Sequence, residues 1–112
     1  MHILGNLENR GVWTPTNTYL EGNAAQFISQ TTGTNYRGYF YISDTVGSVT
    51  FTTPIIYQGP LFDMGNESVQ FGSNKFTALN SRVANGSINS IDTIHFHKTS
   101  FININFYGNY VL

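Results

Sequence analysis

The sequence predicts one all-β domain spanning residues 1–112, built as an antiparallel β-sandwich or a small β-barrel, for which a jelly-roll arrangement is one option. Three observations predict this fold class. The chain is rich in Thr, Tyr, Phe, Ile and Val, and poor in the residues that fill helices. Apolar and polar residues alternate in several short stretches, and Gly, Asn and Pro separate these stretches. A hydrophobic content of 40% is enough for the core of a single domain.

Eight strands are expected along the chain. They cover residues 12–20, 24–31, 37–43, 48–53, 68–71, 75–78, 93–97 and 101–106. Residues suited to tight turns fall between them or beside them, at 33–35, 59–60, 65–66, 72–74 and 85–87. Pro54 and Pro60 bracket the segment 55–59, which is therefore expected to be an edge strand or an ordered loop. No internal repeat is evident.

A hairpin near the C-terminus is the firmest local prediction. Ile94 and Phe96 should share one face of the first strand, because side chains alternate along a strand. The second strand repeats this alternation, with Ile102, Ile104 and Phe106 on one side and Asn103 and Asn105 on the other. Residues 98–100 have about the length of a hairpin loop.

The spacing of three between Ile88, Ile91 and Ile94 leaves a second interpretation open for this region. Such spacing suits one helical turn. Neighbouring Asn, Ser and Asp residues argue against it, because their side chains compete for backbone hydrogen bonds.

Charge is scarce in this chain. Only 10% of residues are charged, and 13 Asn, 13 Thr and nine Ser supply most of the polar surface. Such a surface costs less to desolvate than a charged one, so we expect a homo-oligomer or packing against other virion proteins. Five Lys and Arg residues and a net charge of −1 argue against a nucleic-acid partner. No segment has the roughly 20 apolar residues of a spanning helix, so membrane insertion is not expected.

The N-terminal segment bears on the compartment, which the absence of cysteine leaves undetermined. The chain has no cysteine, which excludes a disulfide framework. Its first residues lack the basic and apolar regions of a signal peptide, so synthesis without one is expected. The predicted location is a virion, or the extracellular space after release, and the cytoplasm if the protein is not viral.

His95 and His97 are the clearest candidates for chemistry, because two histidines at this spacing on a strand share one face and could hold a metal. No pattern identifies a third ligand, and two solvent-facing histidines are the favoured interpretation. The serines lack a Gly-x-Ser-x-Gly elbow, and the glycines form no phosphate-binding loop. The sequence therefore predicts no enzyme and no cofactor.

The segment 10–22 contains the single tryptophan and is the most distinctive part of the chain. Its Gly11, Trp13, Thr18, Tyr19 and Gly22 resemble the opening of small carbohydrate-binding-like modules in bacteriophage tail fibres and of chitin-binding domains. The resemblance covers about 30 residues and implies glycan contact. The chain departs from the pattern after Gly22, where the expected Asn-Gly turn is missing. Residues 11–13 also resemble the G-x-W opening of lipocalin-type barrels, which would imply a small apolar ligand.

Four aromatic residues are predicted to bind a ligand: Trp13, Tyr19, Tyr39 and Tyr41. Flat rings can stack on sugars while nearby Asn and Thr side chains bond to hydroxyls. For Trp13, packing in the core is the favoured alternative. Tyr39 and Tyr41 should share one strand face, opposite Phe40.

The sequence thus predicts a non-enzymatic structural or attachment protein, a phage tail or capsid-associated component that contacts a glycan or receptor. A lipocalin-like barrel that binds a small ligand is the alternative. A metal-dependent enzyme that uses His95 and His97 is the third hypothesis.

Overall fold

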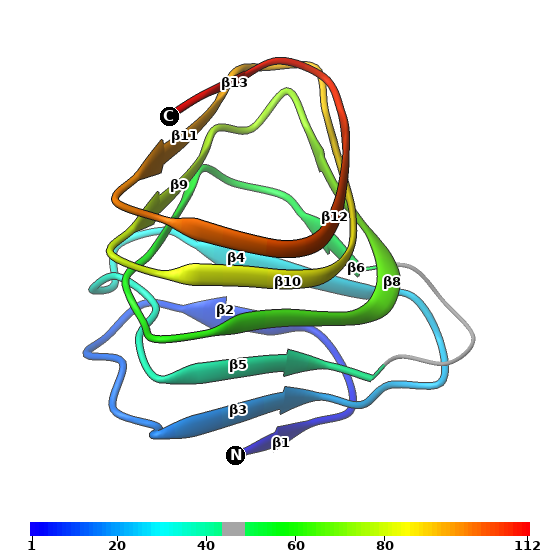
Figure 1. The fold of residues 1–112 in the computed structure, drawn as a ribbon. Helices are drawn as coiled ribbons and strands as arrows, with labels where there is room; N and C mark the ends of the chain where they lie inside the picture. The colour runs from blue at the N-terminus through cyan, green and yellow to red at the C-terminus, as the bar shows by residue number, and fades with distance from the viewer. Residues whose placement is uncertain (44–48) are drawn as a thin grey trace.

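The chain is a parallel β-solenoid. The computed structural model describes residues 1–43 and 49–112, and this part of the chain contains 13 strands and no helix. Every strand pair in it is parallel. The chain winds in successive coils of triangular outline, which stack on one another from the N-terminus to the C-terminus (Figure 1).

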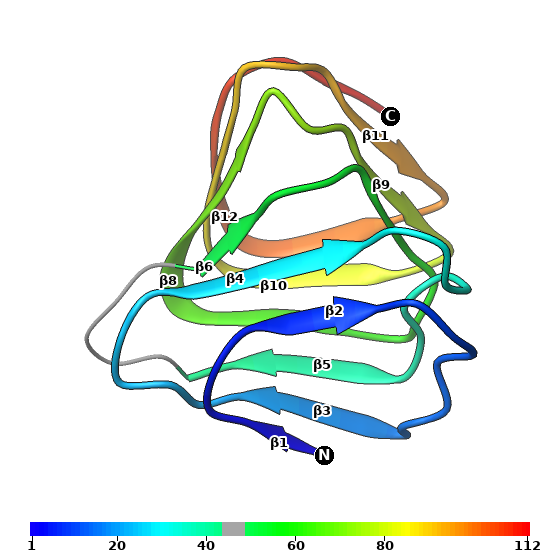
Figure 2. The same ribbon diagram turned by 180° about the vertical axis from the view of Figure 1, so that it is seen from behind.

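Three faces make up the solenoid. The first face carries β1 (His2–Ile3), β3 (Asn17–Leu20) and β5 (Tyr39–Ile42), followed by the first parts of β8 (Phe62–Gly72), β10 (Arg82–Ser90) and β12 (Ser100–Tyr107). The second face carries β2 (Leu7–Asn9), β4 (Gln26–Gln30) and β6 (Val49–Phe51), with the last parts of β8, β10 and β12 (Figure 2). The third face carries β7 (Ile55–Tyr57), β9 (Phe76–Leu79), β11 (Ile94–His97) and β13 (Tyr110–Val111).

The register repeats once per coil. Phe40 pairs with Phe62, Phe62 pairs with Val83, and Val83 pairs with Phe101. Each step along this series is about 20 residues, a period in the range of known solenoid repeats. The sequence does not repeat with the structure, because only the inward or outward orientation of each position has to recur.

Residues with positive φ form the corner between the first and second faces. Gly65 and Asn66 turn β8, while Asn85 turns β10 and Asn103 turns β12, with φ values between 55° and 64°. Glycine and asparagine tolerate this left-handed conformation better than other residues. The Asn103 amide also donates to the Asn85 side-chain oxygen at 3.3 Å, so neighbouring coils are linked at the corner. The chain therefore bends at these residues without reversing.

A continuous hydrophobic core fills the solenoid from Trp13 to Phe96. Aromatic rings dominate it: Phe51 stacks on Phe71 with ring centroids 4.7 Å apart, and Phe76 meets Phe71 edge-on. Burying a large apolar side chain contributes roughly 1.5–3 kcal/mol. The stacked coils are therefore held by apolar burial as well as by the backbone ladders between them.

The expectation of an antiparallel sandwich or barrel is wrong, because the strands are parallel and wind as a solenoid. Composition and alternation correctly indicate strands and turns, but they do not determine whether neighbouring strands run parallel or antiparallel. A hairpin turn and a solenoid corner both use Gly and Asn at positive φ. The corner residues 85–87, expected to form a turn between strands, instead lie inside β10.

The predicted hairpin is also wrong. β11 pairs with β9 and β13, whereas β12 pairs with β10, so the two strands lie on different faces. Ile94 and Phe96 do share one face as predicted, and this face is buried in the core, with 1% and 3% exposure. Strand β12 breaks its alternation at the Asn103 corner, which leaves Ile102 exposed and turns Phe101, Ile104 and Phe106 toward the core.

The structure also decides three other predictions about individual elements. The segment after Pro54 is β7, the edge strand of the third-face sheet. The helical turn suggested by isoleucine spacing is absent from the described residues: Ile88 and Ile94 are buried in strands, and Ile91 is exposed between them. The predicted strand 48–53 is β6, and its first residue, Ser48, lies outside the described residues.

Candidate binding face

A stack of aromatic rings runs across three coils of the first face. His2 stacks on Tyr19 with centroids 4.7 Å apart, and Tyr19 stacks on Tyr41 at 5.2 Å. Tyr39 lies beside Tyr41 in a nearly parallel orientation, at 6.2 Å. The parallel register of β1, β3 and β5 creates this tyrosine stack, because it places Tyr19 beside both His2 and Tyr41.

Three of the four predicted ligand-binding residues therefore come together, namely Tyr19, Tyr39 and Tyr41. Phe40 and Ile42 face the core behind them, as the alternation predicts. Burial raises the pKa of the Tyr41 phenol above its ordinary value, and the neighbouring Tyr19 adds to this effect. The Tyr41 phenol is thus neutral at physiological pH.

Trp13 lies apart from the three tyrosines. Its side chain is 9% exposed and meets Tyr36 edge-on, with centroids 4.6 Å apart. This is the core position that the sequence offers as the alternative. The indole nitrogen is buried without a hydrogen-bond partner among the described residues.

A groove of about 490 Å³ adjoins Tyr39 on the first face, and no sequence pattern indicates it. We call it the tyrosine–arginine groove; its lining residues are Tyr39, Pro60, Leu61, Asn80, Ser81, Arg82 and Ser100. These residues come from four successive coils, so only the parallel register brings them together. Backbone bonds hold the coils in place, including Arg82 N–H to the Pro60 carbonyl at 3.3 Å and Ser100 N–H to the Ser81 carbonyl at 3.0 Å.

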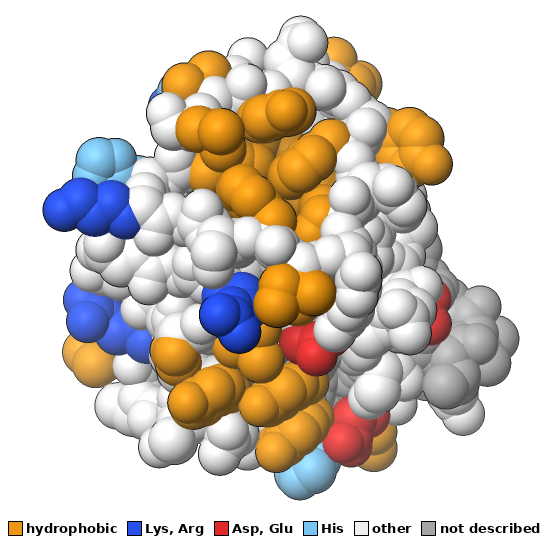
Figure 3. Space-filling view, viewed as in Figure 1, with side chains coloured by type: hydrophobic (Ala, Val, Ile, Leu, Met, Phe, Trp, Pro, Cys, Tyr) orange, Lys and Arg blue, Asp and Glu red, His pale blue; other side chains and the backbone are white. Residues whose placement is uncertain are grey.

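The groove combines one exposed ring with several hydrogen-bonding groups. Tyr39 is 39% exposed, and Arg82 and Asn80 are exposed beside it. Ser81 is buried, and its hydroxyl donates to the Leu79 carbonyl at 2.8 Å. In the space-filling view, apolar side chains lie on the lower part of this face below a basic side chain (Figure 3). An aromatic ring, an amide and a guanidinium together can orient a polar, ring-shaped ligand.

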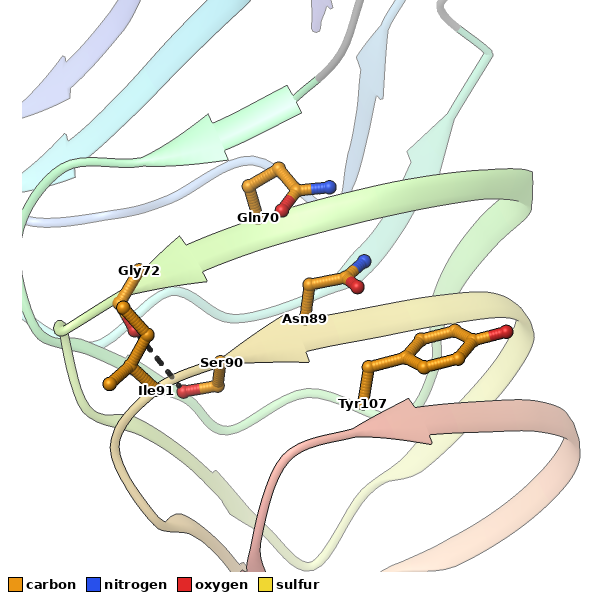
Figure 4. Close-up of a pocket in the computed structure, with 6 residues that line it drawn as sticks. All are labelled: Gln70, Gly72, Asn89, Ser90, Ile91 and Tyr107. Atoms are coloured by element: carbon orange, nitrogen blue, oxygen red, sulfur yellow. Dashed lines mark hydrogen bonds between the residues drawn. The ribbon is translucent and has the colours of Figure 1, made fainter.

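A second, smaller groove of about 270 Å³ lies on the second face. It is lined by Gln70, Gly72, Asn89, Ser90, Ile91 and Tyr107 (Figure 4). Register aligns three of these residues, because Asn89 pairs with both Gln70 and Tyr107. This groove contains an exposed ring and amides but no charged side chain, so it offers no charge-assisted hydrogen bond to a ligand.

His95 and His97 lie on the outer side of β11, away from the core, as predicted. The described residues contain no group of three His, Cys, Asp or Glu side chains that could hold a metal. Trp13 and the other core side chains fill the interior, so the lumen expected for a lipocalin-like barrel is occupied by the protein itself.

No helix in the described part of the chain has the length and apolar character needed to cross a membrane. The chain matches no protein-family model, no curated protein and no solved structure. The resemblance of its N-terminal segment to tail-fibre modules therefore stays a prediction.

Proposed function

We propose that this solenoid is a non-enzymatic attachment module that contacts glycans through the first face. The observation that carries the proposal is the tyrosine–arginine groove, where Tyr39 adjoins amide, hydroxyl and guanidinium groups. Sugars present both apolar ring faces and hydroxyl groups, and this combination of side chains complements both.

Within the tyrosine stack, the main role of Tyr19 and Tyr41 is to hold Tyr39 in position, and Tyr39 is the ring that contacts the ligand. Rings that stack on one another have their faces covered and present mainly edges to solvent, as Tyr19 and Tyr41 do. Tyr39 is the ring that lines the groove, and Tyr41 holds it from one side. We therefore assign ligand contact to Tyr39 and a positioning role to Tyr19 and Tyr41.

A rigid parallel solenoid suits such a role. Its backbone ladders fix the spacing between coils at about 4.8 Å, so side chains on one face keep their positions without a ligand. The proposal that the module belongs to a virion rests on the tail-fibre resemblance, together with the low charge, the many Asn and Thr residues and the absence of cysteine.

Binding to an immobilised panel of neutral and acidic glycans tests the proposal. Tyr39→Ala should weaken the best interaction about 10-fold, the effect of losing roughly 1.4 kcal/mol of ring contact. Tyr107→Ala is the matched control, because Tyr107 is a more exposed tyrosine on the second face. Equal losses in both variants, or no binding to any glycan of the panel, would contradict the proposal.

A further inference from the structure

Arg82 is the charged side chain that lines the tyrosine–arginine groove. It is exposed, and its guanidinium makes no hydrogen bond within the described part of the chain. The ion pairs of the described residues join Glu8 to Arg10 and His2 to Glu21, and neither includes Arg82. Its hydrogen-bonding fork is therefore available to a ligand.

Two further cations occupy the corner where the third face meets the first. Arg37 precedes Tyr39 by two residues, and Lys98 precedes Ser100 by two, so both lie at the entrance to groove-lining strands. Lys98 lies at this corner with a positive φ of 49°. Beside it, the Asn80 N–H of the preceding coil donates a hydrogen bond to the His97 carbonyl at 2.8 Å. The corner beside the groove therefore carries two cations, which are not themselves among the residues that line it.

Carboxylates gather toward the opposite corner of the same face. Glu21 follows β3, Asp63 pairs with Tyr41, and Glu67 follows the corner residues of β8. In the space-filling view, Lys and Arg lie at the left and centre of the face, and Asp and Glu extend from the centre to the right (Figure 3). The field along the face would therefore orient an anionic ligand toward the groove.

We infer that the groove takes a glycan that carries carboxylate groups, such as a polymer of uronic acid. A guanidinium binds a carboxylate through two parallel hydrogen bonds, and Tyr39 lies beside it to contact the sugar ring. This inference rests on the proposed function and adds the chemical class of its ligand.

Oligogalacturonate and its methyl ester are the probes, because esterification removes the charge and keeps the sugar. Titration calorimetry should give an affinity about 10-fold higher for the free acid, and the difference should shrink as salt is added. Dextran sulfate and dextran form a second pair, which separates a carboxylate preference from a general preference for anions. A larger gain from sulfate than from carboxylate would overturn the assignment.

Arg82→Gln should lower the affinity for the free acid about 10-fold, to that for the ester. Lys75→Gln is the matched control, because Lys75 is an exposed cation between β8 and β9, away from the groove. Both substitutions are at exposed positions, and circular dichroism would verify that the fold is kept. Equal binding of acid and ester would overturn this inference and leave the proposed function standing, whereas a failure to bind any glycan would overturn both.

Discussion

At the scale of single residues, asparagine explains much of the composition. Equivalent positions in stacked coils lie only about 4.8 Å apart, so a charged residue in one coil faces a neighbour at close range in the next. Asn, Thr and Ser avoid this repulsion and can bond along the stack, as Asn103 and Asn85 do. In the sequence, the low charge indicates a surface for partners. In the solenoid, the close stacking of equivalent positions is a structural reason for the same low charge.

Among the residues at the corner between the first and second faces, Gly65 is the one whose substitution should lower the free energy of unfolding most. Its φ is 58°, and an added Cβ would collide with the Ile42 carbonyl oxygen of the preceding coil. Gly72 has a similar φ of 57° but open space around it. Gly72→Ala should therefore cost about 1 kcal/mol from the left-handed conformation alone, and Gly65→Ala about 3 kcal/mol or more. Urea unfolding of both variants measures the difference, and equal costs would contradict the close approach of Gly65 to the neighbouring coil.

The buried phenols of Tyr36 and Tyr57 should make the folded protein less stable in alkaline solution. Burial raises the pKa of both groups above the ordinary value of 10.0. Below about pH 10 the phenols are protonated whether the chain is folded or not, so their contribution is fully present. Above that pH the unfolded chain loses protons that the folded chain keeps, so the free energy of unfolding should fall.

Urea unfolding at about pH 9 and about pH 11 would measure this decline. Tyr36→Phe should reduce it, because the variant retains only one of the two buried phenols. A free energy of unfolding that stays constant between the two pH values would contradict the burial of these side chains.

At the scale of elements, the sequence predicts strands better than it predicts their connections. Alternation locates β4, β5, β9, β11 and β12 to within a few residues. It misses β10, because Asn85 and its neighbours indicate a turn, and the structure uses them to bend a strand that continues. A corner also shifts the alternation by one position, which is why the inward side chains of β12 are not two residues apart throughout.

Substitutions of Ile88 and Ile91 distinguish a strand from a helical turn in this region. In β10, Ile88 is fully buried between Val69 and Phe106, while Ile91 is 83% exposed. Ile88→Ala should cost about 2–4 kcal/mol, and Ile91→Ala should change stability by less than about 0.5 kcal/mol. Thermal or urea unfolding checks both values. Similar losses in the two variants would indicate that both side chains are buried, as on one face of a helix.

At the scale of the whole molecule, parallel winding could not be predicted because no residue repeat accompanies the structural one. The candidate site is predictable in part: alternation places Tyr39 and Tyr41 on one face, but only the coil register adds Tyr19 to them. Sequence reasoning identifies Tyr39 but not the groove, because Arg82 lies two coils and Ser100 three coils beyond Tyr39 along the chain.

Self-association stays a prediction at this scale, and the structure suggests where it would occur. Among the described strands β12 pairs only with β10, and residues 99–112 contain no charged side chain. The first coil, by contrast, carries Glu8 and Arg10. An uncharged strand edge readily pairs with another. Light scattering of the 112-residue chain should therefore show dimers, and Ile102→Lys, at an exposed β12 position, should shift them toward monomer. A monomer at all concentrations would contradict this expectation.

The central claim is that the first-face groove binds a glycan that carries carboxylate groups, and an amide chemical-shift titration tests it most directly. Assigned ¹H–¹⁵N spectra would be recorded while oligogalacturonate is added. We predict the largest shifts at Tyr39, Leu61, Ser81, Arg82 and Ser100, with little change on the second and third faces. Shifts centred on Gln70, Asn89 and Tyr107, or no shifts at any concentration, would contradict the claim.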